Sequence, residues 1–221
     1  MSTPTRATIG DQVAEFNVGF NETVGPDLAA VFAAEQSDLT VAGVPHGTVS
    51  VGEVLPEADV VGTTGATVAL SDLLGDGASV LVFYRGAWCP YCNITLKHYN
   101  ETLAPELAER GVALIAISPQ TPDGSAAAVT NGDLGFTVVS DPSNTLSGAL
   151  GIVTAPSAAA QEAHTALGFA VKDSNADATP AIPYPTVVVV DADRVVRFVD
   201  IHVDYTTRTE TEEILHAVDA V

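Results

Sequence analysis

The first 50 residues differ from the rest of the chain in their pattern of apolar and polar positions. Apolar residues recur at helical spacing over residues 12–20 and 27–34, and the Gly25-Pro26 pair between them breaks the pattern. This section contains no chemical motif. We therefore expect residues 1–50 to form a helical arm that packs on the main domain or on a second subunit.

Residues 51–221 show short apolar runs that alternate with helical patterns. A nearly continuous apolar run indicates a strand buried on both faces of a sheet. We expect strands at residues 66–70, 78–84, 112–118, 136–140, 186–191 and 194–199. We expect helices at residues 96–107, 125–131, 144–150 and 158–167. This alternation indicates one α/β domain with a mostly parallel sheet and helices on both faces.

Several residues indicate where these elements begin and end. Pro105 lies inside a helical pattern and should break it, and Gly111 is a natural end for a helix. Residues 151–182 are rich in Ala, Ser and Asp and resemble an insertion. Thr209 and Glu212 have the spacing of a capping box, which predicts a terminal helix. Its buried face should contain Ile214, Leu215, Val218 and Val221.

Composition and charge exclude some classes of partner. The 221 residues include 8 Lys and Arg against 28 Asp and Glu, which gives a net charge of −20. Nucleic acids and anionic membranes are poor partners for such a chain, because both require positive charge. No apolar run approaches the roughly 20 residues of a transmembrane helix, and residues 1–16 lack the pattern of a signal peptide. We therefore expect a cytoplasmic protein.

The two cysteines of the chain, Cys89 and Cys92, lie in the run Trp-Cys-Pro-Tyr-Cys at residues 88–92. The run follows a predicted buried strand and begins a predicted helix. A helix N-terminus has unpaired N–H groups and the positive end of the helix dipole, and both stabilise a thiolate. Pro90 suits the first helical position, and Trp88 can shield one side of the site. These features predict thiol redox chemistry.

Two other interpretations of the cysteines fit this context less well. Inert core cysteines would not require a position between a strand and a helix. A zinc site usually needs four ligands, but the chain has no second Cys-x-x-Cys and no His-x-x-x-His. We interpret His98 as a polar position on the helix that follows the motif. We expect no metal and no cofactor.

Four further residues are candidates for the same site. Arg85 lies four residues before Cys89, where a cation would lower a thiol pKa. Arg208 lies near the start of the terminal helix. For each of the two arginines, the alternative interpretation is an ordinary surface charge. Pro185 precedes a strand, so its peptide bond is either cis, beside the sulfurs, or part of an ordinary rigid turn. We place Tyr84 with Trp88 and Pro185 among the residues that contact substrate.

From about residue 52 to its C-terminus, the chain resembles the AhpC/TSA peroxiredoxin-like branch of the thioredoxin superfamily. The resemblance is carried by Phe-Tyr-Arg-Gly-Ala-Trp-Cys-Pro-Tyr-Cys at residues 83–92, by Ile-Pro-Tyr-Pro-Thr at 182–186 and by Tyr-Thr-Thr-Arg at 205–208. It implies a thioredoxin-like α/β fold, with a central mixed β-sheet flanked by helices and here an N-terminal helical extension. It also implies a homodimer.

The Pro-x-x-x-Thr-x-x-Cys pattern of peroxiredoxins is only partly retained. Its peroxide-reacting cysteine falls on Cys92, and the family's arginine, which activates the thiolate and binds peroxide, matches Arg208. Cys89 takes the threonine position and Arg85 the proline position, so a hydroxyl that should hold the peroxide is missing. In thioredoxins the first cysteine of Trp-Cys-x-x-Cys, here Cys89, is the exposed nucleophile. The resemblance thus leaves open which sulfur reacts first.

Three functions follow from these observations. In a thiol peroxidase, Cys92 would reduce hydrogen peroxide or an organic hydroperoxide, Cys89 would form a disulfide with it, and a thioredoxin-type thiol donor would reset the pair. In a disulfide reductase or exchanger, Cys89 would attack the disulfide of a partner protein. In a non-catalytic thioredoxin-fold binding module, the arm and the acidic surface would be the working parts.

Overall fold

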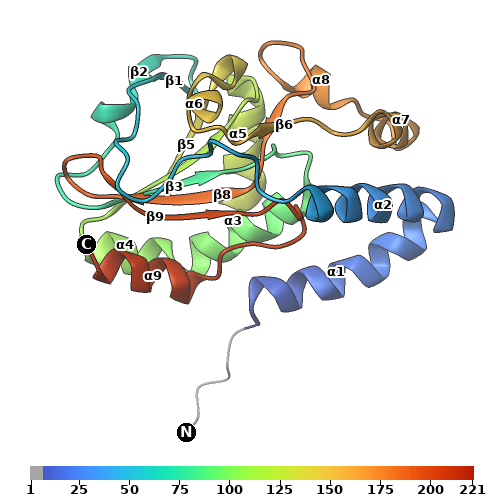
Figure 1. Cartoon of the computed structure of the whole chain (residues 1–221), viewed down its shortest axis with the longest axis horizontal. Coiled ribbons are helices and arrows are strands. Elements are labelled where there is room, and N and C mark those ends of the chain that lie inside the picture. Colours follow the sequence, from blue (N-terminus) through green and yellow to red (C-terminus); the bar gives the residue numbers. More distant parts are fainter. Residues whose placement is uncertain (1–6) are drawn as a thin grey trace, which may run out of the picture.

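A seven-stranded sheet with the order β2-β1-β5-β4-β3-β8-β9 runs through the computed structural model, which describes residues 7–221 (Figure 1). Its strands are β1 (Asp59–Gly62), β2 (Thr67–Ala69), β3 (Ser79–Phe83), β4 (Ala113–Ser118), β5 (Thr137–Ser140), β8 (Thr186–Val190) and β9 (Val196–Ile201). Two short strands, β6 (Val153–Thr154) and β7 (Ile182–Pro183), pair separately.

Parallel pairing is confined to the centre of the sheet. Strand β4 runs parallel to β3 and β5, whereas the pairs β1–β2, β1–β5, β3–β8 and β8–β9 are antiparallel. The mixed sheet implied by the family resemblance is confirmed, and the expectation of a mostly parallel sheet is wrong. Residues 151–182 return the chain to the end of β3, so that β8 starts with Thr186 opposite Phe83. Strand β8 must therefore run back along β3.

Helices cover both faces of the sheet (Figure 1). They are α1 (Ile9–Val24), α2 (Pro26–Ala42), α3 (Pro90–Thr102), α4 (Ala104–Glu109), α5 (Pro122–Gly132), α6 (Thr145–Ala149), α7 (Ala158–Ala166), α8 (Val171–Ser174) and α9 (Thr211–Asp219). Two 3₁₀ turns, η1 (Leu70–Asp72) and η2 (Pro142–Asn144), complete the structure. Within residues 7–221, no helix has the length and apolar character needed to cross a membrane.

The central strands are buried on both faces, as their apolar runs predict. In β3, Val80 and Val82 join the core cluster that contains residues of α1, α3, α4 and α9. Leu81 and Phe83 join the cluster on the other face, which includes residues of α6. Successive side chains of a strand point to opposite faces, so β3 connects the two halves of the core and ends directly before the cysteine motif.

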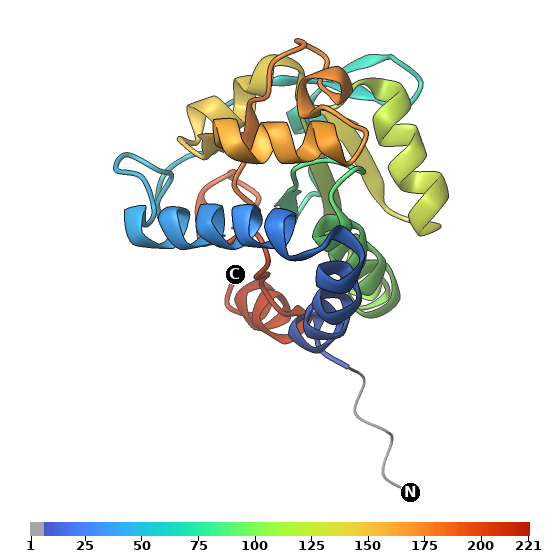
Figure 2. The same ribbon diagram turned by 90° about the vertical axis from the view of Figure 1, so that its right-hand side faces the viewer.

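The N-terminal arm is helical, as predicted, and it packs on the main domain. Ile9 and Val13 of α1 belong to the same buried cluster as α3 and α9. Figure 2 shows α2 alongside α7 of the 151–182 insertion, and the two helices are in contact. His98 is buried rather than exposed on its helix, and its Nδ1 lies 2.8 Å from Nε2 of Gln12 on α1. The domain boundary near residue 50 stays a prediction.

Helix ends follow the sequence signals with two corrections. The helix with Pro105 is broken there, since α3 ends at Thr102 and α4 begins at Ala104. The capping box of α9 is formed by Glu210 and Glu213, one residue later than expected, because the Thr209 hydroxyl donates to Asp200 instead. Helix α9 ends at Asp219, which leaves Val221 48% exposed and not on the buried face.

Replacing Glu210 with Ala tests how the arm is attached. The Glu210 carboxylate accepts hydrogen bonds from the N–H groups of Ile9 and Gly10, at 3.0 Å each, and it also caps α9. We expect the substitution to lower the free energy of unfolding by about 1–3 kcal/mol, because these amides lose their partner. Urea denaturation followed by circular dichroism measures the change.

Glu212→Ala is the matched control, since Glu212 is an exposed residue in the first turn of the same helix. It should change the free energy of unfolding by less than about 0.5 kcal/mol. Equal losses in the two variants would contradict an anchoring role for Glu210.

Candidate active site

The turn between β3 and α3 places the two cysteines at the N-terminus of α3. Gly86 in this turn has a φ of +146°, and a Cβ there would lie 2.5 Å from Nε1 of Trp88, so the turn requires glycine. The N–H of Ala87 donates to Oε1 of the buried Gln120 at 2.7 Å, which holds the turn in place. Cys89 is the N-cap of α3 and Pro90 follows at the start of the helix, as the motif predicts.

Cys92 is fully buried and is surrounded by hydrogen-bond donors. Nη2 of Arg208 lies 3.3 Å from its Sγ, and the S–H of Cys89 and the backbone N–H of Arg85 also donate to it. Burial opposes ionisation of Cys92, but the hydrogen bond from Cys89 and the charge of Arg208 outweigh it and lower the pKa of Cys92 to about 5. Cys92 is therefore a thiolate at neutral pH.

Cys89 has the opposite ionisation state. Burial raises the pKa of its thiol well above the usual value, and the hydrogen bond to Cys92 and the negative charge there raise the pKa further. The pair thus holds one proton and one negative charge, with Arg85 and Arg208 as the cations that act on both sulfurs. This arrangement resembles two coupled acids more than two independent thiols.

Arg208 is held in position by the loop that precedes α9. Its Nη1 donates to the carbonyl oxygens of Tyr205 and Thr207, at 2.6 Å each, which leaves Nη2 directed at Cys92. In the same loop, Nε2 of His202 lies 2.9 Å from the carboxylate of Asp200. The match of Arg208 to the family's arginine therefore agrees with its contact to Cys92.

A small cavity of about 10 Å³ lies beside Cys92, and Tyr84, Pro185, His202 and Arg208 line part of it. This volume is close to what one water molecule needs. Burial raises the pKa of Tyr84 to about 12, so its hydroxyl stays protonated. Pro185 lines the same small cavity as Cys92, and its peptide bond is trans, like every peptide bond in residues 7–221. The cis alternative is therefore wrong, and Pro185 lies in the short link between β7 and β8.

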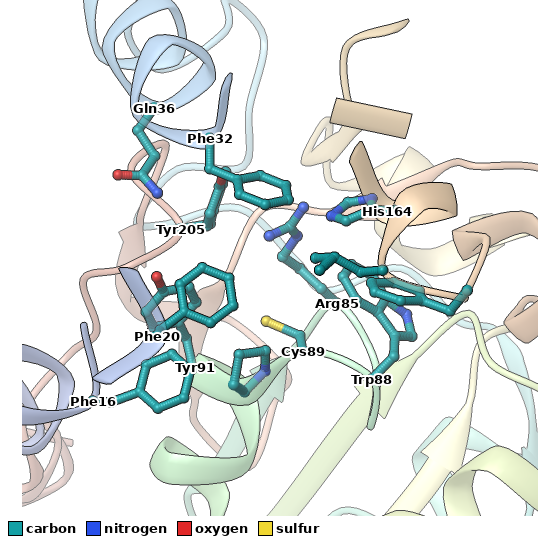
Figure 3. A pocket seen from close by; sticks show the side chains of 13 residues that line it. Phe16, Phe20, Phe32, Gln36, Arg85, Trp88, Cys89, Tyr91, His164 and Tyr205 are labelled. Carbon is teal, nitrogen blue, oxygen red and sulfur yellow. The ribbon is translucent and has the colours of Figure 1, made fainter. Parts of the chain in front are cut away.

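A second, wider cavity of about 310 Å³ adjoins Cys89, and Figure 3 shows the Cys89 sulfur pointing into it. Helices α1 and α2 form one wall, the cysteine motif forms the floor, and α7 with the loop after it forms the opposite wall. The aromatic side chains of the walls are Phe16, Phe20, Phe32, Trp88, Tyr91, Phe169 and Tyr205. The two sulfurs therefore face spaces of very different size.

Arg85 is the cation of this wider cavity. Its guanidinium lies 4.0 Å from the ring centroid of Tyr205 and 5.0 Å from that of Trp88, and the residue is only 5% exposed. Beside it lies His164, whose pKa is lowered to about 4 by burial and then by the charge of Arg85, so that its ring is neutral (Figure 3). The candidate role of Arg85 near the sulfurs is consistent with this position.

The structure thus brings together all seven residues that the sequence singled out, and it adds others. Phe32 and His164 were not candidates, although both line the wide cavity and their rings contact each other with centroids 5.3 Å apart. Aromatic residues at helical spacing look the same in a sequence whether they fill a core or line a cavity. No set of three or more His, Cys, Asp or Glu side chains within residues 7–221 is placed to hold a metal ion.

A redox-capable cysteine pair at the start of a helix, directly after the central strand of a mixed sheet, defines a thiol-redox protein of the thioredoxin-fold class. A family model described as the AhpC/TSA family matches residues 51–199. The match covers more than half of the sequence, and the chain therefore belongs to the AhpC/TSA family. This membership supports a thiol-dependent redox role. A search among curated proteins finds no match.

Solved structures with a similar fold include three that cover most of this chain. Peroxidoxin BcpB from Mycobacterium tuberculosis is 24% identical with a TM-score of 0.59, over 78% of this chain and 98% of that one. Reduced Prx3 in complex with H₂O₂ from Vibrio vulnificus is 19% identical with a TM-score of 0.61, over 77% and 99%. A putative protein disulfide isomerase from Bacteroides thetaiotaomicron is 17% identical with a TM-score of 0.51, over 78% and 87%. Identities this low show the fold alone.

Replacing Arg208 with Met tests the electrostatics of the thiolate. Removal of this cation should raise the pKa of Cys92 by about 1–3 units, because an opposite charge at this distance favours the ionised form. Wild-type protein should keep its thiolate down to about pH 5, whereas the variant should lose it at a higher pH. The ultraviolet absorbance of the thiolate during an acid titration of the reduced protein measures both values.

Arg197→Met is the control, since Arg197 is exposed on β9 and pairs with Asp191. It should leave the titration unchanged. A pKa of Cys92 that is the same in the Arg208→Met variant as in wild type would show that Arg208 does not stabilise the thiolate.

Proposed function

We propose that the chain is a thiol peroxidase that reduces hydrogen peroxide or organic hydroperoxides, with Cys92 as the attacking sulfur. The observation that carries this proposal is the contact of Cys92 Sγ with Arg208 at a cysteine whose pKa is lowered to about 5. The thiolate is the form of cysteine that attacks a peroxide. The guanidinium can also stabilise the negative charge that develops on the leaving oxygen.

In the proposed cycle, the Cys92 thiolate attacks one peroxide oxygen and the O–O bond breaks. The other oxygen leaves with the bonding electron pair and takes a proton from water, so that an alcohol or water is released and Cys92 becomes a sulfenic acid. The sulfur of Cys89 then attacks the sulfenic sulfur. Hydroxide leaves, takes the proton of Cys89 and departs as water, and a disulfide remains. Two electrons from a thiol donor restore the pair.

Cys89 supports this proposal by its position. It occupies the place where the peroxiredoxin pattern has a threonine, and its S–H donates to the Cys92 thiolate. The missing hydroxyl is thus replaced by a thiol that provides the same hydrogen bond. Because it is also a thiol, the same group can form the disulfide once Cys92 is oxidised.

A second candidate function is disulfide reduction or exchange. The observation that favours it is the direction of the Cys89 sulfur, which points into the wide cavity (Figure 3). Cys92 lines only the small cavity. Cys89 would transfer its proton to Cys92, attack one sulfur of a partner disulfide and release the other as a thiolate. One structural relative is described as a putative protein disulfide isomerase.

Single cysteine substitutions separate the two candidates. If Cys92 attacks peroxide, Cys89→Ser should still form a sulfenic acid, because a serine hydroxyl also donates a hydrogen bond to the Cys92 thiolate. Cys92→Ser should react with peroxide no faster than a free thiol. Stopped-flow fluorescence of Trp88, the single tryptophan of the chain, follows the reaction. Trapping with dimedone and mass spectrometry identifies the oxidised residue.

The opposite pattern would favour exchange. If Cys92→Ser forms mixed disulfides with other proteins, and neither variant forms a sulfenic acid faster than a free thiol, the peroxidase proposal is wrong. Each serine variant differs from the wild-type protein only by the replacement of one sulfur with oxygen. A difference in reactivity between the two variants therefore reports the separate roles of the two sulfurs.

A further inference from the structure

The wide cavity adjoins the sulfur that does not attack first in the proposed peroxidase cycle. Its volume of about 310 Å³ is far more than a hydrogen peroxide molecule fills, and it lies within the range of sites that bind small molecules. A catalytic cycle with a disulfide intermediate needs a second reactant besides the peroxide, namely the thiol that reduces the disulfide. The position of the cavity suits that reactant.

The geometry determines which sulfur the reductant meets. Thiol–disulfide exchange proceeds by attack of a thiolate on one sulfur while the other sulfur leaves. Cys89 lines the wide cavity, whereas Cys92 lines the cavity of about 10 Å³ behind it. A thiol in the wide cavity is therefore adjacent to Cys89, whose side chain is 0% exposed and must be uncovered by a small shift of the lining before it is attacked. Cys92 then leaves as a thiolate next to the Arg208 guanidinium, 3.3 Å away in the reduced state.

The walls of the cavity define the chemistry of its occupant. Phe16, Phe20 and Phe32 of the arm face Trp88 and Phe169, which gives a mostly aromatic lining. An apolar body gains free energy by filling such a space, because it leaves water and contacts ring faces. A strongly hydrated peptide donor would lose its hydration without gaining partners there.

Arg85 adds a requirement for negative charge. Arg85 is only 5% exposed. Within residues 7–221 its guanidinium forms no ion pair. Glu35 of α2 is also buried and lines a small neighbouring cavity together with Arg85, but its Oε1 accepts from the N–H of Ser157 and it forms no ion pair with Arg85; its Oε2 has no hydrogen-bond partner within residues 7–221. A buried guanidinium with ring contacts only is a strong site for a carboxylate, which it can bind by two hydrogen bonds.

Oxidation of the sulfurs increases this requirement. In the reduced pair, the negative charge on Cys92 offsets the charges of Arg85 and Arg208. Disulfide formation removes that charge, so the buried Arg85 and the half-buried Arg208 lose the negative charge that offsets them. An anion should therefore bind the oxidised protein more tightly than the reduced protein, because a ligand favours the state for which it has the higher affinity.

We propose that the wide cavity binds a small thiol reductant with an aromatic or alkyl body and a carboxylate, with the carboxylate on Arg85 and the sulfur at Cys89. This inference rests on the proposed disulfide cycle. The reductant's thiolate bonds to Cys89 and displaces Cys92 as a thiolate. A second thiolate of the same class attacks the reductant's sulfur in the mixed disulfide and releases Cys89, which takes up a proton. The reductant leaves as its disulfide, oxidised by two electrons.

The test measures the reductive half of the cycle alone. Wild-type protein is oxidised to the disulfide with diamide, so the experiment does not depend on peroxide turnover, and Trp88 fluorescence follows reduction. The probes are para-(mercaptomethyl)benzoate, its methyl ester and mercaptoethanol. We expect the acid to reduce the protein about tenfold faster than the ester, because it adds a charge-assisted hydrogen bond to Arg85. Equal rates for the acid and the ester would overturn the proposal.

Two variants locate the binding site. Phe32→Ala should slow reduction by both aromatic thiols but not by mercaptoethanol, and the control Phe198→Ala, on β9 outside the cavity lining, should not. Arg85→Gln should bring the acid-to-ester ratio close to one. This ratio cancels any change in the leaving-group properties of Cys92, since both thiols displace the same sulfur. A ratio that stays at the wild-type value would also overturn the proposal.

A binding measurement without redox chemistry completes the test. Titration calorimetry with para-methylbenzoate, which has no thiol, should give about tenfold tighter binding to the oxidised than to the reduced protein. Equal affinities, or tighter binding to the reduced protein, would contradict the inference. Failure of peroxide turnover with these results intact would instead contradict the proposed peroxidase function.

Discussion

One negative charge buried between two sulfurs is the constraint on which the rest of the structure depends. A thiolate removed from water is unstable unless donors and cations replace the lost hydration. Here the replacements are the guanidinium of Arg208, the backbone N–H of Arg85 and the S–H of Cys89. They come from the loop before α9, from the turn after β3 and from the N-cap of α3. The charge on Cys92 is thus stable only when these three segments keep their positions relative to one another.

The fold meets this constraint by fixing each segment to the sheet or to its neighbour. Strand β3 is paired on both sides and ends where the turn begins. Gln120, directly after β4, holds the turn through the N–H of Ala87. The buried hydroxyl of Tyr99 on α3 donates to the carbonyl of Thr209, which attaches the Arg208 loop to the helix that carries Cys92. The rigidity of the site is therefore a property of the central sheet and its neighbouring helices.

Much of this arrangement follows from local sequence patterns, and some of it cannot. The strand before Cys89, the helix after it and the two helices of the arm were predicted because their signals are short-range. Arg208 was a candidate from its place near the terminal helix, but only the family resemblance gave it a role at the cysteine, since a contact across 116 residues leaves no spacing signal. The strand at residues 186–190 was predicted, but not its antiparallel pairing with β3, because the path of residues 151–182 sets its direction. The cap at Thr209 was predicted wrongly because the Thr209 hydroxyl donates to Asp200 instead. Asp200 lies on β9, outside the few residues that a capping-box pattern considers.

The cavity at Cys89 is shared between the family's core and a segment outside the matched residues 51–199. The arm supplies one wall and is attached to the motif by the Tyr91 hydroxyl, which donates to Asn17 of α1 at 2.8 Å. In the proposed cycle, the arm walls that would contact the reductant at Cys89 belong to a different segment from Arg208, which lies against Cys92. If that cycle operates, substitutions on the faces of α1 and α2 that line the cavity would change the preferred reductant and leave the reactivity toward peroxide unchanged, so that the two properties would be free to evolve independently.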